Sequence, residues 1–301
     1  MNKLFIVIIL FLIAIVIGIV AGPVPLDSTI FQLRLSRVIL GIFAGGILAF
    51  CGGILQGLFG NPLVEPYTLG SASGAALGGS IGILFLGAIN PIFAFLGSLG
   101  VGFFVFTIAR IEGGLFRDRL ILAGVIMSFL CSSLVMIFMV MGRRELYEIL
   151  YLLMGYLGVI IDSSNRVLII VLIVISMALV IFLYQYHREL DIISQGLETA
   201  SGLGIDIQKF SIIVFFVTSL LIGLMVSIVG AIGFVGLIIP HIAKLLFGPR
   251  HLYNLPASFI LGATFILFAD TISRTITVYE LPVGVVTSLI GVPFFIYLYK
   301  K

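Results

Sequence analysis

Runs of about 20 apolar residues recur along the whole chain, separated by short polar connections. One such run crosses about 30 Å of hydrocarbon as a helix, because an α-helix rises about 1.5 Å per residue. Charged residues make up 10% of the 301 residues, against about a quarter in a soluble protein. The sequence therefore predicts an all-α integral membrane protein with no soluble domain between its spans.

Polar, glycine or proline breaks divide the apolar runs into about ten predicted transmembrane helices. An even number places both termini on one side, and Lys and Arg indicate that side because they concentrate in cytoplasmic loops. With cytoplasmic termini, ten of the 16 basic residues lie inside and six outside. We therefore expect one multi-pass domain over residues 1–301 in the plasma membrane, with both termini cytoplasmic. The predicted spans are residues 4–22, 38–59, 67–89, 91–109, 120–141, 167–186, 210–230, 232–248, 256–272 and 281–299.

Small residues recur at four-residue intervals in two of the spans, which places them on one helix face. Membrane helices associate through such faces, because lipid offers no hydrophobic drive and small residues let two backbones approach closely. We interpret both rows as packing faces, with a pore-lining role as the alternative. The rows are Gly41, Gly45, Ala49, Gly53 and Gly57 in the second span and Gly70, Gly74, Gly78 and Gly82 in the third.

Ionisable residues are nearly absent from the centres of the spans. Proton-coupled carriers and voltage sensors need such residues at membrane depth, so their scarcity disfavours both classes. Asp270 and Arg274 lie four residues apart near the outer end of the ninth span, which predicts an ion pair. Glu65, within NPLVEP, is interpreted as an exposed acid in a cytoplasmic turn whose prolines stop the flanking helices.

The chain carries no recognisable catalytic or metal-binding motif. It has no P-loop of the form GxxxxGK[ST], no nucleophile elbow and no HExxH, and its histidines have no Cys or carboxylate at metal-ligand spacing. Cys51 and Cys131 lie in apolar runs and are interpreted as small buried hydrophobes. The sequence therefore predicts neither an enzyme nor a metal site, and it does not support nucleic-acid binding.

Four stretches, in order from Arg34 to the C-terminus, carry a resemblance to a known family. They read RLSRVILGIFAGGILAFCGGILQGLFGNPLVEPYTLGSASGAALG, GLETASGLG, GAIGFVGLIIPHIAKLLFGPRH and ADTISRTITVYELPVGVVTSLIGVPFFIYLYK. These stretches resemble the FecCD family of ABC-transporter permeases, which serve importers of vitamin B12, iron-siderophores and haem. The resemblance implies the type II ABC importer permease fold: ten membrane helices per subunit, two subunits around a central pathway, two cytoplasmic ATPases and an external binding protein.

The resemblance assigns a role to two arginines on the outer side. Arg34 matches the first Arg of the family's RLPR element, and Arg274 matches the Arg ahead of LPVG. Both resemble residues that pair with glutamates of the extracytoplasmic substrate-binding protein, a charge-assisted contact. Ser36 replaces the usual Pro of the RLPR element. The alternative for both arginines is anchoring of helix ends at lipid headgroups.

The longest predicted cytoplasmic connection, residues 187–209, resembles the family's coupling helix, which rests in a cleft of the ATPase. Leu197 stands where an acid is common, and Glu198 supplies an acid at the next position. A solvated surface loop is the alternative interpretation. The residues implied in coupling are Gly196, Glu198, Ala200, Leu203 and Gly204.

Two further elements resemble parts of the family's inner gate. Asn61 and Leu63 of NPLVEP match positions that narrow the gate. Arg117 and Asp118 of RIEGGLFRDR stand where the B12 permease has small hydroxyl residues. This charged pair either forms an ion-pair gate across the dimer axis or faces water.

The resemblance therefore implies the membrane-spanning permease subunit of an ATP-driven importer for a metal chelate: an iron-siderophore, haem or cobalamin. A second copy would complete a pathway along the two-fold axis, lined by the fifth and tenth spans. Two separate ATPase subunits would handle ATP and Mg²⁺, and this chain would hold no cofactor. An ion-coupled secondary transporter and a channel are the alternatives, and the former needs a midplane carboxylate or a broken-helix ion site.

Overall fold

Among the residues that the structure describes, seven long apolar helices and three shorter ones form the bundle. The computed structural model describes residues 2–86, 90–111, 114–115, 117–142, 146–277 and 279–299. Each of the ten predicted spans falls on one of these helices, which confirms the all-helical membrane fold. The long helices are α1 (Asn2–Val20), α2 (Ser28–Phe59), α4 (Pro91–Ala109), α5 (Arg117–Met141), α7 (Arg166–Tyr184), α10 (Ile207–Val229) and α12 (His251–Thr275). The shorter ones are α3 (Ser71–Leu86), α11 (Val235–Phe247) and α13 (Val283–Tyr299).

Short elements fill the connections between these helices. Helix α6 (Leu146–Met154) was not predicted, because its nine residues are too few to register as a span. The third predicted span begins with a separate 3-10 turn, η1 (Pro66–Leu69). The remaining short elements are α8 (His187–Ile193), α9 (Leu197–Gly202) and an antiparallel hairpin of two-residue strands, β1 (Arg110–Ile111) and β2 (Gly114–Leu115).

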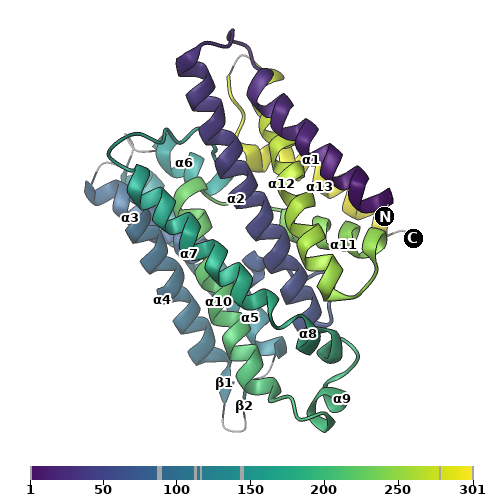
Figure 1. Ribbon diagram of the computed structural model, residues 1–301. Coiled ribbons are helices and arrows are strands. Elements are labelled where there is room, and N and C mark those ends of the chain that lie inside the picture. Colours follow the sequence, from purple (N-terminus) through teal and green to yellow (C-terminus); the bar gives the residue numbers. More distant parts are fainter. Residues whose placement is uncertain are drawn as a thin grey trace.

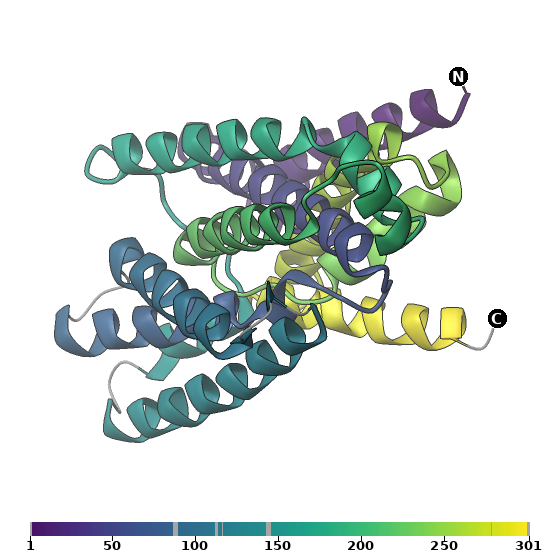
Figure 2. The ribbon, with the colours of Figure 1, turned by 90° about the horizontal axis from the view of Figure 1, so that it is seen from below.

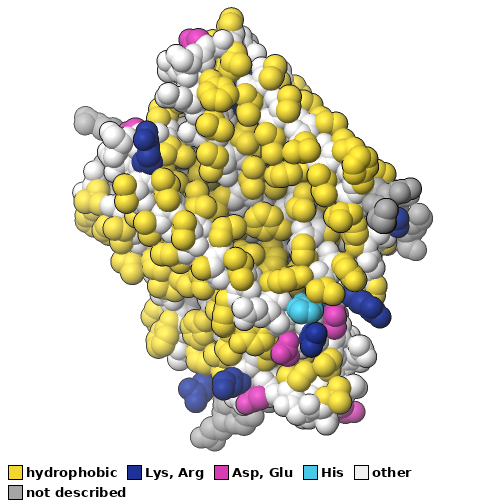
Figure 3. Space-filling view, in the orientation of Figure 1, with side chains coloured by type: hydrophobic (Ala, Val, Ile, Leu, Met, Phe, Trp, Pro, Cys, Tyr) yellow, Lys and Arg dark blue, Asp and Glu magenta, His cyan; other side chains and the backbone are white. Residues whose placement is uncertain are grey.

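The bundle has two distinct ends. Helix α1 begins and helix α13 ends at the same end as α8 and α9, which we call the terminal end (Figures 1 and 2). Helix α6 and the connection between α1 and α2 lie at the opposite end, the α6 end (Figure 1). The face in Figure 3 is apolar across its middle, and most of its charged side chains gather near α8, α9 and the hairpin. This distribution suits a bundle whose middle lies in hydrocarbon.

The two rows of small residues are packing faces, as predicted. A Cβ on Gly45 would lie 2.2 Å from the carbonyl oxygen of Gly262 in α12. A Cβ on Gly78 would lie 2.1 Å from the carbonyl oxygen of Phe93 in α4. Cβ atoms do not approach backbone oxygens this closely, so α2 with α12 and α3 with α4 depend on glycine at these contacts.

Helix α2 forms the centre of the bundle and packs against α10, α11 and α12. Cys51 lies on it, fully buried, and Cys131 on α5 is buried as well. Both thiols are free, in agreement with their interpretation as small hydrophobes.

Gln56 of α2 donates hydrogen bonds where a proline interrupts the backbone hydrogen bonding of α11. Pro240 lies inside α11 and has no N–H, so the carbonyl of Gly236, four residues earlier, lacks its helical donor. The Gln56 amide nitrogen donates to this carbonyl at 3.2 Å and to that of Leu237 at 3.1 Å. A polar amide is therefore retained in an apolar helix because a neighbouring helix contains a proline.

Candidate functional site

Residues 60–70, the re-entrant segment, lead from α2 back into the bundle. Gly60 ends α2 in the left-handed conformation with φ 63°. The Asn61 carboxamide oxygen accepts a hydrogen bond from the Leu63 N–H at 2.9 Å and tightens the turn. Val64 is buried, and Pro66 begins η1, where its fixed φ suits the first residue of a helix.

Contacts with α5 and α11 place η1 inside the bundle. A Cβ on Gly124 of α5 would lie 2.1 Å from the carbonyl oxygen of Thr68. Gly124 is two helical turns from the start of α5, a rise of about 10 Å. Pro66 contacts Gly236 of α11 with similar closeness, its Cδ 2.5 Å from the position a Cβ would take. The re-entrant segment thus reaches about 10 Å into the bundle from the terminal end.

The loop between α10 and α11 meets this segment. The Tyr67 hydroxyl oxygen accepts a hydrogen bond from the Ile232 N–H at 2.6 Å. Glu65 accepts a hydrogen bond from the backbone N–H of Phe234, which has a left-handed φ of 68°. The interpretation of Glu65 as an exposed acid is wrong, because its side chain is partly buried and lines a cavity. Burial raises the pKa of the Glu65 carboxyl, and the Phe234 hydrogen bond partly opposes this shift.

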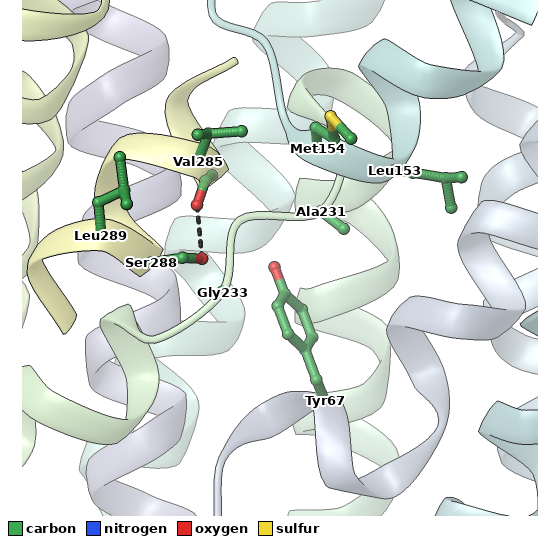
Figure 4. Close-up of a pocket in the computed structure, with 9 residues that line it drawn as sticks. Tyr67, Leu153, Met154, Ala231, Gly233, Val285, Ser288 and Leu289 are labelled. Atoms are coloured by element: carbon green, nitrogen blue, oxygen red, sulfur yellow. Dashed lines mark hydrogen bonds between the residues drawn. The ribbon is translucent and has the colours of Figure 1, made fainter. Parts of the chain in front are cut away.

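Two adjoining cavities open beside Tyr67, with volumes of about 470 and 380 Å³. They share Tyr67, Leu153 and Ala231, and together we call them the Tyr67 groove. Figure 4 shows the Tyr67 ring reaching up from η1, with its hydroxyl next to the loop at Ala231 and Gly233 and the side chains of α13 on the other side of that loop. Helix α5 contributes Val125, Ser128 and Phe129, and helix α13 contributes Val285, Ser288 and Leu289.

Most polar groups of the groove are engaged within the protein. The Ser288 hydroxyl donates to the Gly284 carbonyl at 2.7 Å (Figure 4), and the Ser73 hydroxyl donates to the Gly70 carbonyl at 2.8 Å. Tyr67 differs, because its oxygen accepts from Ile232 and the described residues show no acceptor for its own proton. Glu65 is the only Asp, Glu, Lys, Arg or His among the described residues that line the groove. The described residues also contain no cluster of three His, Cys, Asp or Glu that could hold a metal ion.

A second polar site lies at the α6 end, where α1, α2 and α12 meet. Arg37 bridges Asp270 at 3.1 Å and Glu280 at 2.5 Å. Arg274 pairs with the same Asp270 at 3.1 Å, which confirms the predicted i, i+4 ion pair. Its guanidinium also donates to the carbonyls of α1 and the turn after it, at Gly18 and Ala21.

Arg34 ties the same turn to α2. Its guanidinium donates to the carbonyls of Ile19, Val20 and Val24 at 3.0, 2.7 and 2.5 Å. Arg34 and Arg274 are only 5% and 4% exposed, so both fasten α1 to the bundle. A cavity of about 260 Å³ nevertheless reaches them, lined also by Arg37, Tyr156 and Glu280.

Helices α8 and α9 form the projecting surface of the terminal end. Asp191 of α8 accepts hydrogen bonds from the backbone N–H and Nδ1 of His251, at 2.8 and 2.6 Å, and so joins α8 to α12. Ala200 of α9 is fully buried, whereas Leu203 is 65% exposed. Gly196 and Gly204 bracket α9 with φ of 141° and 83°, values that other residues rarely adopt.

Comparison with known proteins identifies the family. Residues 3–301 match the FecCD transport family. The chain belongs to the FecCD transport family. It is 37% identical to the cobalamin import system permease protein BtuC of Halobacterium salinarum, over 92% of this chain and 75% of that protein. It is 34% identical to the Fe(3+)-citrate import system permease protein YfmD of Bacillus subtilis, over 90% and 81% of the two chains.

A solved structure confirms the predicted type of fold. This FecCD chain superposes on an inward-facing metal-chelate type ABC transporter with a TM-score of 0.86 and 32% identity. The match covers 100% of this chain and 99% of the other. The ABC importer permease fold that the sequence implied is therefore present.

The FecCD residues singled out from the sequence fall in separate places. The docking residues Arg34 and Arg274 lie at the α6 end, and the coupling residues lie on and around α9 at the terminal end. Asn61 and Leu63 are exposed at the start of the re-entrant segment. Asp118 is exposed in the first turn of α5, and the side chain of Arg117 lies outside the described residues. All these roles stay predictions.

Several residues that organise both polar sites of this FecCD chain were not predicted from the sequence. Tyr67 was not singled out, although a tyrosine after the last proline of NPLVEP was a visible signal. Arg37 was overlooked, although its i, i+3 spacing from Arg34 places both on one face of α2. The pairing of Glu280 with Arg37 had no local signal, because 243 positions separate them.

Proposed function

We propose that this chain is the membrane-spanning permease subunit of an ATP-driven ABC importer for a metal chelate. The observation that carries the proposal is the Tyr67 groove, an open groove on the bundle of a FecCD-family chain, lined by α5 and α13. Relatives of the chain are named as permeases of cobalamin and Fe(3+)-citrate import systems. These names lead us to propose that the cargo is a chelate of iron or cobalt, a class that includes haem. Transport needs no cofactor in this chain, because two separate ATPase subunits bind ATP and Mg²⁺.

A second copy of the chain completes the pathway. The groove is bordered by large apolar side chains that are exposed in the single chain, Phe129 on α5 and Leu289 on α13, at 73% and 68%. A transport pathway must be closed to lipid on every side, so an open groove needs a second wall. Symmetric pairing of two grooves supplies that wall along a two-fold axis, with the fifth and tenth predicted spans facing the path.

The two ends of the bundle suit two different soluble partners. The terminal end lies in the cytoplasm of a plasma-membrane importer, together with both termini, and α9 there seats in a cleft of each ATPase. Leu203 is the exposed apolar anchor of that contact, and Glu198 is its acid. Gly196 and Gly204 give α9 the tight turns that let it project.

The α6 end receives the extracytoplasmic substrate-binding protein. The cavity there lets a carboxylate of the docked protein approach Arg34 and Arg274 from outside while the guanidiniums keep their carbonyl partners. An Arg guanidinium has five N–H donors, so one side chain serves both partners. At the opposite end, Asn61, Leu63, Arg117 and Asp118 form the inner gate below the groove.

Reconstitution tests this function. The chain is co-expressed with the ATPase encoded beside it, purified through a tag on the chain, and placed in liposomes with its binding protein. We expect a stoichiometric complex whose ATP hydrolysis rises with the loaded binding protein and which takes up a metal chelate. A chain that purifies alone and moves solute without ATP would instead be a secondary carrier or a channel, and in the carrier Glu65 would be the coupling carboxylate.

A further inference from the structure

The Tyr67 groove carries charge of one sign only. Glu65 is an acid, and no Lys, Arg or His is among the described residues that line the two cavities. The remaining lining consists of apolar side chains, glycines and hydroxyl groups. The arginines of the α6 end do not compensate, because Arg37 and Arg274 are paired with Asp270 in a separate cavity.

Depth makes the charge of Glu65 effective. The residue follows directly on the buried Val64 and precedes the contact of Pro66 with Gly236, so it lies inside the bundle. Its environment screens charge less than bulk water, and a charge on passing cargo therefore interacts with it at a distance of several ångströms. Burial raises the pKa of the Glu65 carboxyl, the Phe234 hydrogen bond partly opposes this shift, and the group carries its charge above that pKa.

Tyr67 adds a hydrogen-bond donor next to this carboxyl. Its oxygen accepts a hydrogen bond from the Ile232 N–H, and the ring, drawn in Figure 4, lines both cavities. The hydroxyl proton is then left to point toward an oxygen of the cargo. Amide, hydroxamate and ether oxygens accept such a bond without carrying negative charge.

We infer that the Tyr67 groove selects its cargo by charge: it passes neutral and cationic chelates with oxygen acceptors and disfavours anionic ones, with Glu65 as the selecting residue. This inference rests on the proposed function and narrows its cargo: cobalamin and neutral or cationic siderophores fit the groove, whereas haem and Fe(3+)-citrate, which carry negative charge, are disfavoured. Glu65 repels anionic chelates from the narrow part of the path and attracts cationic ones. Tyr67 contacts both accepted classes through its hydroxyl.

Three ferric trihydroxamates with the same iron-binding core test this inference. One ends in an ammonium, one is N-acetylated and neutral, and one is N-succinylated and anionic. ATP-dependent uptake of each is measured in liposomes holding the complete complex, with saturating loaded binding protein. Each rate in Glu65→Gln is divided by the wild-type rate for the same chelate, so that any preference of the binding protein cancels.

We expect Glu65→Gln to raise uptake of the anionic chelate relative to the cationic one by about tenfold, the effect of one charge at roughly 10 Å in a partly screened site. Gln keeps an oxygen that accepts from the Phe234 N–H, so the fold is conserved. Asp162→Asn removes an exposed carboxyl at the α6 end as the matched control, and it should leave the ratio unchanged. Tyr67→Phe should slow the neutral and cationic chelates without altering their ratio.

The experiment distinguishes a failure of the charge selection from a failure of the importer function. ATP-dependent uptake with the same anion-to-cation ratio in wild type and Glu65→Gln would overturn the charge selection and leave the importer function standing. Absence of ATP-dependent uptake of every chelate would overturn the importer function itself. If Glu65→Gln does not assemble, the wild-type complex still decides, because faster uptake of the anionic than of the cationic chelate contradicts the inference.

Discussion

The side-chain amide nitrogen of Gln56 lies 3.2 Å from the carbonyl oxygen of Gly236, and this hydrogen bond joins α2 to α11. The carbonyl is open because Pro240 provides no N–H. The contact lies where the two backbones are closest, since a Cβ on Gly52 would meet the same oxygen at 1.9 Å. The Gln56 side chain thus supplies the hydrogen bond that Pro240 removes from the backbone of α11.

Replacing Gln56 by Leu should lower the free energy of unfolding by about 1–3 kcal/mol, because the buried Gly236 carbonyl, which has no helical donor, loses the Gln56 donor as well. The measurement is thermal unfolding of the purified protein in detergent. Gln32→Leu is the matched control, since Gln32 is exposed on the same helix. A loss of stability as large for Gln32→Leu as for Gln56→Leu would contradict the assigned role.

Glycine-to-alanine exchanges should separate contact glycines from free ones. Gly45→Ala places a methyl 2.2 Å from the Gly262 carbonyl oxygen and should destabilise the bundle by about 1–3 kcal/mol or prevent its folding. Gly100→Ala, within α4 and with no atom within 4 Å of its Cβ position, should leave stability unchanged or raise it slightly. Melting in detergent measures both, and equal effects would show that helix propensity, not contact, governs these positions.

The buried ion cluster should depend on its central acid. Asp270→Asn leaves Arg37 and Arg274 without a shared counter-charge and should cost about 3–5 kcal/mol. Glu280→Gln should cost less than about 1 kcal/mol, because that carboxyl is 41% exposed and water replaces the contact. Denaturation of the two variants in the same detergent gives the comparison. A milder effect of Asp270→Asn than of Glu280→Gln would contradict the ranking.

Leu203, the exposed apolar residue that directly follows α9, should govern assembly with the ATPase. Leu203→Asp puts a charge on the surface proposed to enter the ATPase cleft, and we expect the ATPase to be lost from the purified complex. Leu26→Asp, at an exposed apolar residue of the opposite end, should retain the ATPase. Quantitative co-purification measures both. Retention of the ATPase by Leu203→Asp would move the contact elsewhere on the terminal end.

Charge selection in the groove should fade in acid. Burial raises the pKa of Glu65, and the group is charged above that pKa and neutral below it. Rejection of the anionic trihydroxamate should therefore be strongest at high pH and weaken as pH falls through the pKa of Glu65. The described lining residues include no other acid and no His, so Glu65→Gln should remove this pH dependence. A pH profile of the uptake ratio that is the same in the wild type and in Glu65→Gln would contradict the prediction.

Much of the architecture followed from sequence. The ten spans, the family and the packing role of Gly45 and Gly78 are local properties: apolar length, motif order and four-residue spacing. Each of these properties can be predicted from residues close together in the sequence. None requires knowing which helices contact each other. The ion pair of Asp270 with Arg274 belongs to the same group, because one helical turn brings the two together.

Tertiary structure alone decided the candidate site. Tyr67 meets Ile232 across 165 positions, and Arg37 meets Asp270 across 233. A helix that is apolar on every side does not reveal which face meets a neighbour, so the sequence contained no pattern for these pairs. Glu65 was misjudged for the same reason: a carboxyl between prolines is usually solvated, and here the glycines of α5 and α11 admit the segment that carries it into the bundle.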